Sequence, residues 1–138
     1  MHTPMKALRN IPLLAWLLVV CNVLVFIRES SLQTILLQVP LISGATFSLD
    51  LGHLLLMVGV ILLYFEIIKA THTTNSAIVD HVLSTLVLIV FLIEFITVRQ
   101  CGSATFLTLA FMALVDVVAG FTVTISSAKR DFSLGQSQ

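Results

Sequence analysis

Residues 51–70 read LGHLLLMVGVILLYFEIIKA, and this stretch decides the fold class. An apolar run of about 20 residues is long enough to cross roughly 30 Å of hydrocarbon as a helix. Gly52, Gly59 and Glu66 recur at the same interval and share one helix face. A face of small residues that also carries a carboxylate favours contact with protein over contact with lipid. We therefore expect this helix to be the second of four membrane spans, with the others packed around it.

The composition of the chain also indicates a membrane protein. Of its 138 residues, 58% are hydrophobic and only 10% are charged, and the mean hydropathy is +1.09. Soluble domains carry about 25% charged residues, so this chain lacks the charge for a water-facing surface. A net charge of zero excludes the basic surface with which proteins bind nucleic acid. The two cysteines, Cys21 and Cys101, form no CxxC motif and are expected to be free thiols.

Three further apolar runs complete the expected architecture, which is an all-α bundle of four transmembrane helices in a single membrane domain covering residues 1–138. These runs cover about residues 11–27, 78–98 and 105–125. No small-x-small cleavage pattern follows the first run, so we expect a retained helix rather than a signal peptide. Residues 126–138 are expected to form a polar, mobile tail.

The longest connection between the runs covers residues 30–50, SSLQTILLQVPLISGATFSLD. Its apolar part, residues 32–42, is too short to cross the bilayer, and Pro40 would break a helix there. An interfacial segment and a re-entrant segment both remain open. Ser48 and Asp50 are suitable caps for the helix that follows.

The charges in the loops predict the orientation. By the positive-inside rule, the side with more lysine and arginine faces the cytoplasm. One side carries Lys6, Arg9, Lys69, Lys129 and Arg130, whereas the other carries Arg28 and Arg99. We therefore expect both the N-terminus and the C-terminus to be cytoplasmic.

Polar side chains within or beside the spans are the candidate functional residues, because an ionisable group inside a membrane is costly unless it is paired or has a function. In the third span, acidic residues and Ser84 follow one helical stripe from Asp80 to Glu94. In the fourth span, Asp116 shares a face with alanine and glycine. The candidates are Asn22, His53, Glu66, His81, Glu94, Arg99 and Asp116.

Antiparallel packing predicts which candidates lie at the same depth. Glu66 and His81 lie near the inner ends of their spans, whereas His53, Glu94 and Arg99 lie toward the outer side. For the two glutamates, pairing or snorkelling is the competing structural interpretation. Asn22 is expected to bond a neighbouring helix.

Asp116 differs from the other candidates, because it lies closer to the midplane than they do and the sequence suggests no partner for it. A carboxylate at that depth must be paired, hydrated or protonated. We therefore weigh a functional role for Asp116 equally against a structural one.

The sequence predicts neither an enzyme nor a cofactor. His53 and His81 begin successive antiparallel spans and would lie at opposite faces of the bilayer, so they could not ligate one haem. The histidines lack zinc-ligand spacing, so no metal site is predicted. No P-loop, GxSxG or HExxH motif is present.

Residues 62–70, LLYFEIIKA, resemble the aromatic-Phe-Glu segment of the phosphate-starvation-inducible E (PsiE) family. The exit of the first span at residues 28–30, the long apolar connection and the closing pair at residues 129–130 are also similar to that family. The chain departs from the family late in the third span, where Glu94 stands in place of an expected basic residue. The resemblance implies a small multi-pass protein of the bacterial inner membrane with no established chemistry. It carries over Glu66 alone as a notable position.

These observations predict a small non-catalytic integral membrane protein, either PsiE-like or an accessory subunit of a larger membrane complex. Its expected partners are the lipid bilayer and other membrane subunits or further copies of itself. The alternative is a proton- or ion-coupled transporter or channel, with Glu66, Asp116 and Glu94 as stations at inner, middle and outer depths. Transporters usually show internal repeats and broken helices, which this sequence does not show.

Overall fold

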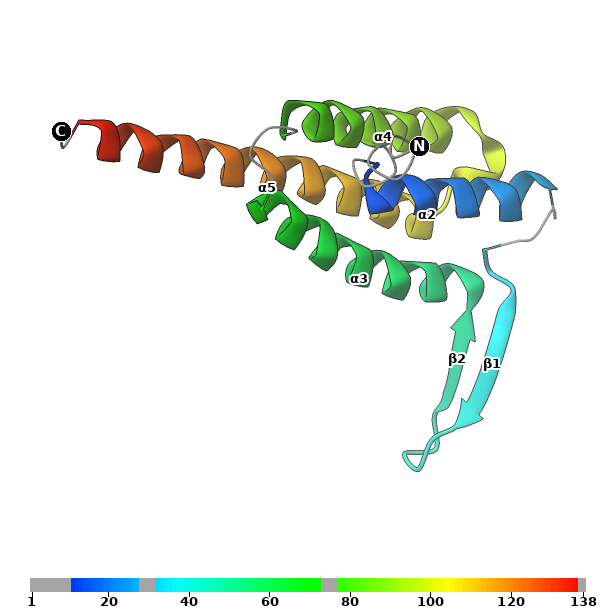
Figure 1. The fold of residues 1–138 in the computed structure, drawn as a ribbon. Helices are drawn as coiled ribbons and strands as arrows, with labels where there is room; N and C mark the ends of the chain where they lie inside the picture. Colours follow the sequence, from blue (N-terminus) through cyan, green and yellow to red (C-terminus); the bar gives the residue numbers. More distant parts are fainter. Residues whose placement is uncertain (1–10, 28–31, 73–76, 137–138) are drawn as a thin grey trace, which may run out of the picture.

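The computed structural model describes residues 11–27, 32–72 and 77–136. The helices run alongside one another, and a small two-stranded hairpin projects from one end of the bundle (Figure 1). In chain order the elements are α2 (Leu13–Asn22), the π-helix η1 (Val23–Ile27), β1 (Ile35–Pro40), β2 (Thr46–Asp50), α3 (Leu51–His72), α4 (Ala77–Thr97), the 3-10 helix η2 (Arg99–Cys101) and α5 (Ala104–Gly135). Lys6, Arg9, Arg28 and Glu29 lie outside the described residues, as do residues 73–76.

Three of the helices, α3, α4 and α5, are long and apolar enough to cross a membrane. This confirms the predicted predominance of helix, and it shows that the last three runs have the length and hydropathy that a membrane span needs. Within the described residues the first run forms a shorter helix, in which α2 and η1 together cover Leu13–Ile27. At about 1.5 Å per residue this described stretch is roughly 22 Å long, less than the hydrocarbon thickness of about 30 Å.

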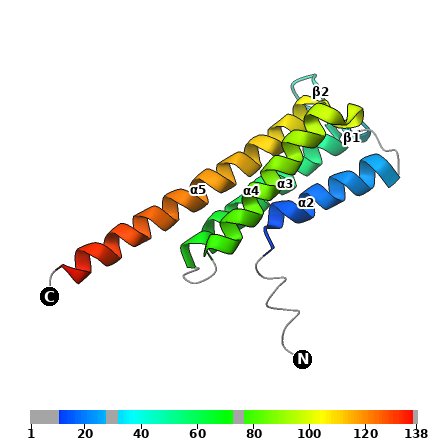
Figure 2. The same ribbon diagram turned by 90° about the horizontal axis from the view of Figure 1, so that it is seen from above.

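The helices pack around α5, which lies against both α3 and α4, while α2 also packs against α3 and α4. Figure 2 shows α5 continuing well beyond the ends of the other helices toward the C-terminus. Phe91 of α4 and Phe106 of α5 are both 0% exposed, and their ring centroids lie 5.4 Å apart in an edge-to-face arrangement. Such a pair fixes where two helices cross, because it combines a large buried area with a specific geometry.

The small-residue face of α3 faces protein, as predicted. Gly52, Gly59 and Glu66 are all buried. At Gly59 an added Cβ would lie 2.9 Å from Met112 Sδ and 3.1 Å from Leu17 Cδ2. Glycine therefore lets α2 and α5 approach α3 closely, as small residues do between membrane helices.

The polar stripes of α4 and α5 are also confirmed. Asp80 and Ser84 are buried, and Glu94 at the other end of the stripe is half-buried. Asp116 and Gly120 of α5 are buried as well. The helical period therefore identified the inward faces of both helices correctly.

Residues 32–42 are not helical, so the prediction of an all-α protein was wrong for this segment. They contribute β1, which pairs with β2 in antiparallel register. Gly44 has φ 85° in the connecting turn, a conformation that glycine adopts without steric cost. Pro40 excludes a helix, and the alternation of apolar and polar residues around Gln38 and Ser48 has the period of a strand. The high overall apolar content of the segment masks this alternation in the sequence.

Residues 126–138 were expected to form a polar, mobile tail, and the structure continues α5 as a helix through this segment to Gly135. Extending an existing helix costs much less than nucleating a new one, and residues 126–135 contain no proline. The start of α5 is capped by Ser103, whose hydroxyl accepts a hydrogen bond of 3.2 Å from the Phe106 N–H.

Candidate intramembrane polar site

Buried carboxylates from two helices meet at the ammonium group of Lys69. Its Nζ lies 3.2 Å from Glu66 Oε1, one turn earlier on α3, and 3.2 Å from Asp80 Oδ1 in the first turn of α4. Glu66 is 1% exposed and Asp80 is 7% exposed. Both acids therefore depend on Lys69, because an unpaired charge at this burial would cost several kcal/mol.

The side chain of Asp116 on α5 adds a third carboxylate next to Lys69 and its two acidic partners. It is buried, and the buried hydroxyl of Ser84 donates a hydrogen bond to it. Glu66, Asp80 and Lys69 all lie close enough to act on Asp116 electrostatically. The sequence suggested no partner for Asp116, but the fold supplies Ser84 from α4. We call Glu66, Lys69, Asp80, Ser84 and Asp116 the Lys69 cluster.

The Lys69 cluster also holds the start of α2. The backbone N–H of Leu13, the first residue of α2, donates a short hydrogen bond to Glu66 Oε1. The first N–H groups of a helix have no partner within the helix, and the helix dipole favours a negative charge there. Glu66 therefore connects α2 to α3, while Lys69 connects α3 to α4.

The charge of the Lys69 cluster is unbalanced. Three carboxyl groups share one ammonium group, so with every group ionised the net charge would be −2. Asp80 Oδ1 faces Lys69 Nζ, but it has no partner at hydrogen-bonding geometry. Within the described ranges, no set of three or more His, Cys, Asp or Glu side chains is arranged to hold a metal ion. The chemistry open to this arrangement is charge pairing and the binding or exchange of protons.

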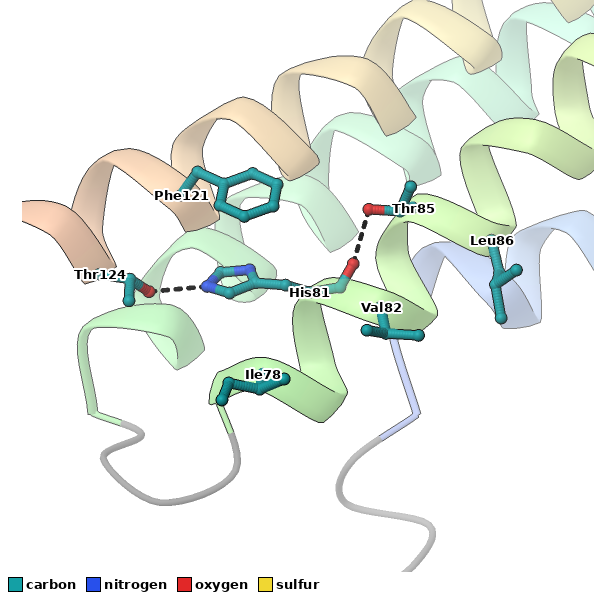
Figure 3. Close-up of a pocket in the computed structure, with 7 residues that line it drawn as sticks. All are labelled: Ile78, His81, Val82, Thr85, Leu86, Phe121 and Thr124. Atoms are coloured by element: carbon teal, nitrogen blue, oxygen red, sulfur yellow. Dashed lines mark hydrogen bonds between the residues drawn. The ribbon is translucent and has the colours of Figure 1, made fainter.

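His81 lies near the N-terminal end of α4 and points toward α5 (Figure 3). Its Nε2 lies 2.6 Å from Thr124 Oγ1, and its ring stacks on Phe121 with centroids 4.7 Å apart. The Thr124 hydroxyl donates its single hydrogen to the Gly120 carbonyl at 3.0 Å. It can therefore only accept from His81, which assigns the proton to Nε2. The polar partner of His81 is thus Thr124, and not Glu66 at the matching depth.

Beside His81, α4 and α5 form an open groove of about 370 Å³. Its polar groups are already paired, because His81 bonds Thr124 and the Thr85 hydroxyl bonds the His81 carbonyl at 2.7 Å. The groove therefore presents an almost wholly apolar surface. We call it the α4–α5 groove, and it is lined by Ile78, His81, Val82, Thr85, Leu86, Phe121 and Thr124.

A second polar contact lies toward the other end of α4. Asn22 Nδ2 donates a hydrogen bond of 2.8 Å to Glu94 Oε1, which confirms that Asn22 bonds a neighbouring helix. Cys21 and Cys101 lie near this pair as free, fully buried thiols. Burial and, second, the charge of Glu94 raise the pKa of the Cys101 thiol in η2, so this thiol stays protonated and poorly nucleophilic.

His53 and Arg99 do not join the Lys69 cluster. The His53 ring Nδ1 lies 2.7 Å from Asp50 Oδ1, and the same oxygen accepts the His53 backbone N–H at 2.7 Å. Asp50 therefore caps α3, as predicted. The hydrogen bonds from the backbone and then the ring of His53 lower the pKa of the Asp50 carboxyl. Arg99 lies exposed in η2, at the opposite end of α4 from Asp80.

The Lys69 cluster thus joins two of the predicted candidates, Glu66 and Asp116, and adds residues that were not among them, while a separate hydrogen bond joins Asn22 to Glu94. Lys69 could have been found, because it lies three positions after Glu66 and so on the same side of the helix. Asp80 and Ser84 stood on a recognised stripe, but no sequence rule pairs that stripe with α5. The contact of His81 with Gly120 and Thr124 depends on how closely α4 and α5 approach each other.

Comparison of the chain with protein family models, with curated proteins and with solved structures finds no match.

Proposed function

We propose that this chain is a small non-catalytic integral membrane protein that works as an accessory subunit, by contacts made inside the bilayer. In this proposal the helix of α2 and η1 joins α3, α4 and α5 as a fourth span, and both termini are cytoplasmic. The resemblance of residues 62–70 to the PsiE family supports the inner membrane of a bacterial cell as its location.

The observation that carries this proposal is the α4–α5 groove. Membrane helices associate by close packing, because lipid tails are as apolar as their side chains and no hydrophobic force drives them together. A concave apolar surface whose polar groups are already satisfied offers that packing to a convex helix. The occupant that we propose is a transmembrane helix of a second subunit or of a second copy of this chain.

Native mass spectrometry of gently solubilised protein tests this proposal. We expect the wild-type chain to appear as a complex. Leu86→Trp, which fills the groove, should dissociate it, whereas Ile96→Trp, at an exposed position of α4 outside the groove, should leave it intact. A wild-type chain that is always monomeric, or equal effects of the two substitutions, would contradict the proposal.

A second candidate function is proton-coupled transport, and the Lys69 cluster specifically favours it. Three buried carboxyl groups around one ammonium group can hold and release protons between three helices, and chains of intramembrane acids serve this role in pumps. Under this hypothesis Asp116→Asn should abolish proton flux in reconstituted liposomes. Asp131→Asn, on the exposed end of the same helix, should not. Wild-type liposomes without flux above that of empty liposomes would exclude this candidate.

A further inference from the structure

The β1–β2 hairpin has two chemically different faces. In its antiparallel register, Leu37 faces Leu49 and Val39 faces Phe47. Directly opposed residues of two strands lie on the same face of the sheet, so these four side chains form one apolar face. The alternate pair, Gln38 with Ser48, lies on the other face. The hairpin is therefore amphipathic.

The apolar face is uncovered. Leu37 is 49% exposed and Phe47 is 45% exposed, and at the turn the exposure of Ile42 reaches 109%. An isolated two-stranded hairpin is marginally stable in water and needs a further surface to pack on. Something apolar must therefore cover this face in the working protein.

The position of the hairpin indicates what covers it. Leu51 N–H bonds the Thr34 carbonyl at 2.9 Å, and Gly52 N–H bonds the Leu32 carbonyl at 2.7 Å, so the base of the hairpin is fastened to the first turn of α3. From there the hairpin projects sideways, across the direction of the helices, and stays level with their ends (Figures 1 and 2). With the helices spanning a bilayer, that direction lies in the plane of the membrane, at the depth of its surface.

The absence of charged residues from most of the hairpin also favours a position at the membrane surface. Residues 32–49 contain no Asp, Glu, Lys or Arg. Hairpins that stand in water commonly carry charges that protect their edges from unwanted strand pairing. The absence of charge here instead suits the boundary between headgroups and acyl chains, where apolar side chains of surface-lying segments are buried.

We propose that the β1–β2 hairpin is a lipid-binding anchor, whose apolar face and turn insert among the acyl chains at one surface of the bilayer. Gln38 and Ser48 then face the headgroups and water. The hairpin fixes the depth of α3 through the two hydrogen bonds at its base. This inference needs only a membrane around the helices, and holds whether or not the α4–α5 groove binds a subunit.

Depth-dependent fluorescence quenching tests the anchor. Trp16 is the only tryptophan, so Trp16→Phe provides a silent background in the full-length chain. Phe47→Trp and Ser48→Trp then place single reporters at neighbouring positions on opposite faces. In phosphatidylcholine–phosphatidylglycerol vesicles, lipids brominated near the glycerol end of their chains should quench the reporter at position 47 several-fold more strongly than the one at position 48. Acrylamide in the water should give the reverse order.

Two results would overturn the proposal. If acrylamide quenches both reporters equally, the hairpin stands in water. If neither acrylamide nor brominated lipid quenches the reporter at position 47, protein covers the apolar face. Circular dichroism must show unchanged helix content in each variant, and Ile42→Trp at the turn gives an independent reporter that should behave like the one at position 47.

Discussion

The side chain of Lys69 has two carboxylate oxygens within 3.2 Å and a third carboxyl group nearby. A buried ion pair adds little stability compared with apolar side chains of the same shape, but removing one partner leaves the other charge buried and unpaired. Lys69 is therefore the residue on which Glu66, Asp80 and the N-terminus of α2 all depend.

Replacing Lys69 with Met should destabilise the bundle by about 3 kcal/mol, the usual magnitude for breaking a buried ion pair from one side. The measurement is thermal or denaturant unfolding in mild detergent. Lys69→Arg keeps the positive charge and should lose much less stability. Equal stability of the Met variant and the wild type would show that the two acids do not need this ammonium group.

Asp50 caps the N-terminus of α3, and the stabilisation that this cap gives depends on pH because the carboxyl group titrates. The His53 hydrogen bonds hold the pKa of the folded Asp50 carboxyl below its ordinary value of 3.8. Because this pKa is lowered in the folded state, the cap stabilises α3 at a pH above the ordinary pKa of Asp. This stabilisation is lost as the pH falls through the pKa of the folded state.

We therefore expect the first-turn amides of α3 to exchange hydrogen faster, relative to their intrinsic rates, once the pH falls below about 4, near the ordinary Asp pKa. Asp50→Asn should remove this acid-dependent step, because an amide still accepts the His53 N–H but does not titrate in that range. Hydrogen exchange measured by NMR in detergent checks both expectations. The role of the cap would be contradicted if, in the wild type, the protection of these amides from hydrogen exchange did not change as the pH is lowered until Asp50 is fully protonated.

Among the elements, α4 and α5 depend on a glycine for their close approach. An added Cβ at Gly120 would lie 2.7 Å from His81 Cε1 and 2.9 Å from His81 Nδ1. The ring cannot give way without leaving Thr124 or Phe121, which hold it on two sides.

Gly120→Ala should therefore destabilise the protein, although alanine is favoured over glycine in a helix by about 1 kcal/mol. Gly135→Ala is the matched control on the same helix, because an added Cβ there has no neighbour within 4 Å. We expect a lower unfolding temperature for the first variant and an unchanged or higher one for the second. A stabilised Gly120→Ala variant would show that α4 and α5 do not approach this closely.

The elements also show where sequence reasoning succeeds. The three long apolar helices, the inward face of α3 and the Asp80–Glu94 stripe follow from hydropathy and helical period, which depend on local sequence alone. The hairpin was missed because the apolar character of residues 32–42 hid an alternation with period two. The Lys69 cluster was found only in part, since Asp80 and Asp116 meet through a pairing of helices that no local pattern encodes.

For the whole molecule, the surface of the long helices suits lipid better than water as its solvent. Residues such as Ile61, Tyr64 and Ile78 are more than half exposed on the long helices, which is an energetic cost in water but none in hydrocarbon. The polar groups are correspondingly collected between helices, in the Lys69 cluster and in the pair of Asn22 with Glu94.

The number of crossings is the central claim, because α3, α4 and α5 alone would put the two termini on opposite sides of the membrane. Epitope tags at both ends, probed with membrane-impermeant reagents in intact spheroplasts and in inverted vesicles, measure this directly. A fourth crossing by Leu13–Ile27 predicts that both tags are protected in spheroplasts and both are reached in inverted vesicles. Tags reached from opposite sides would contradict it.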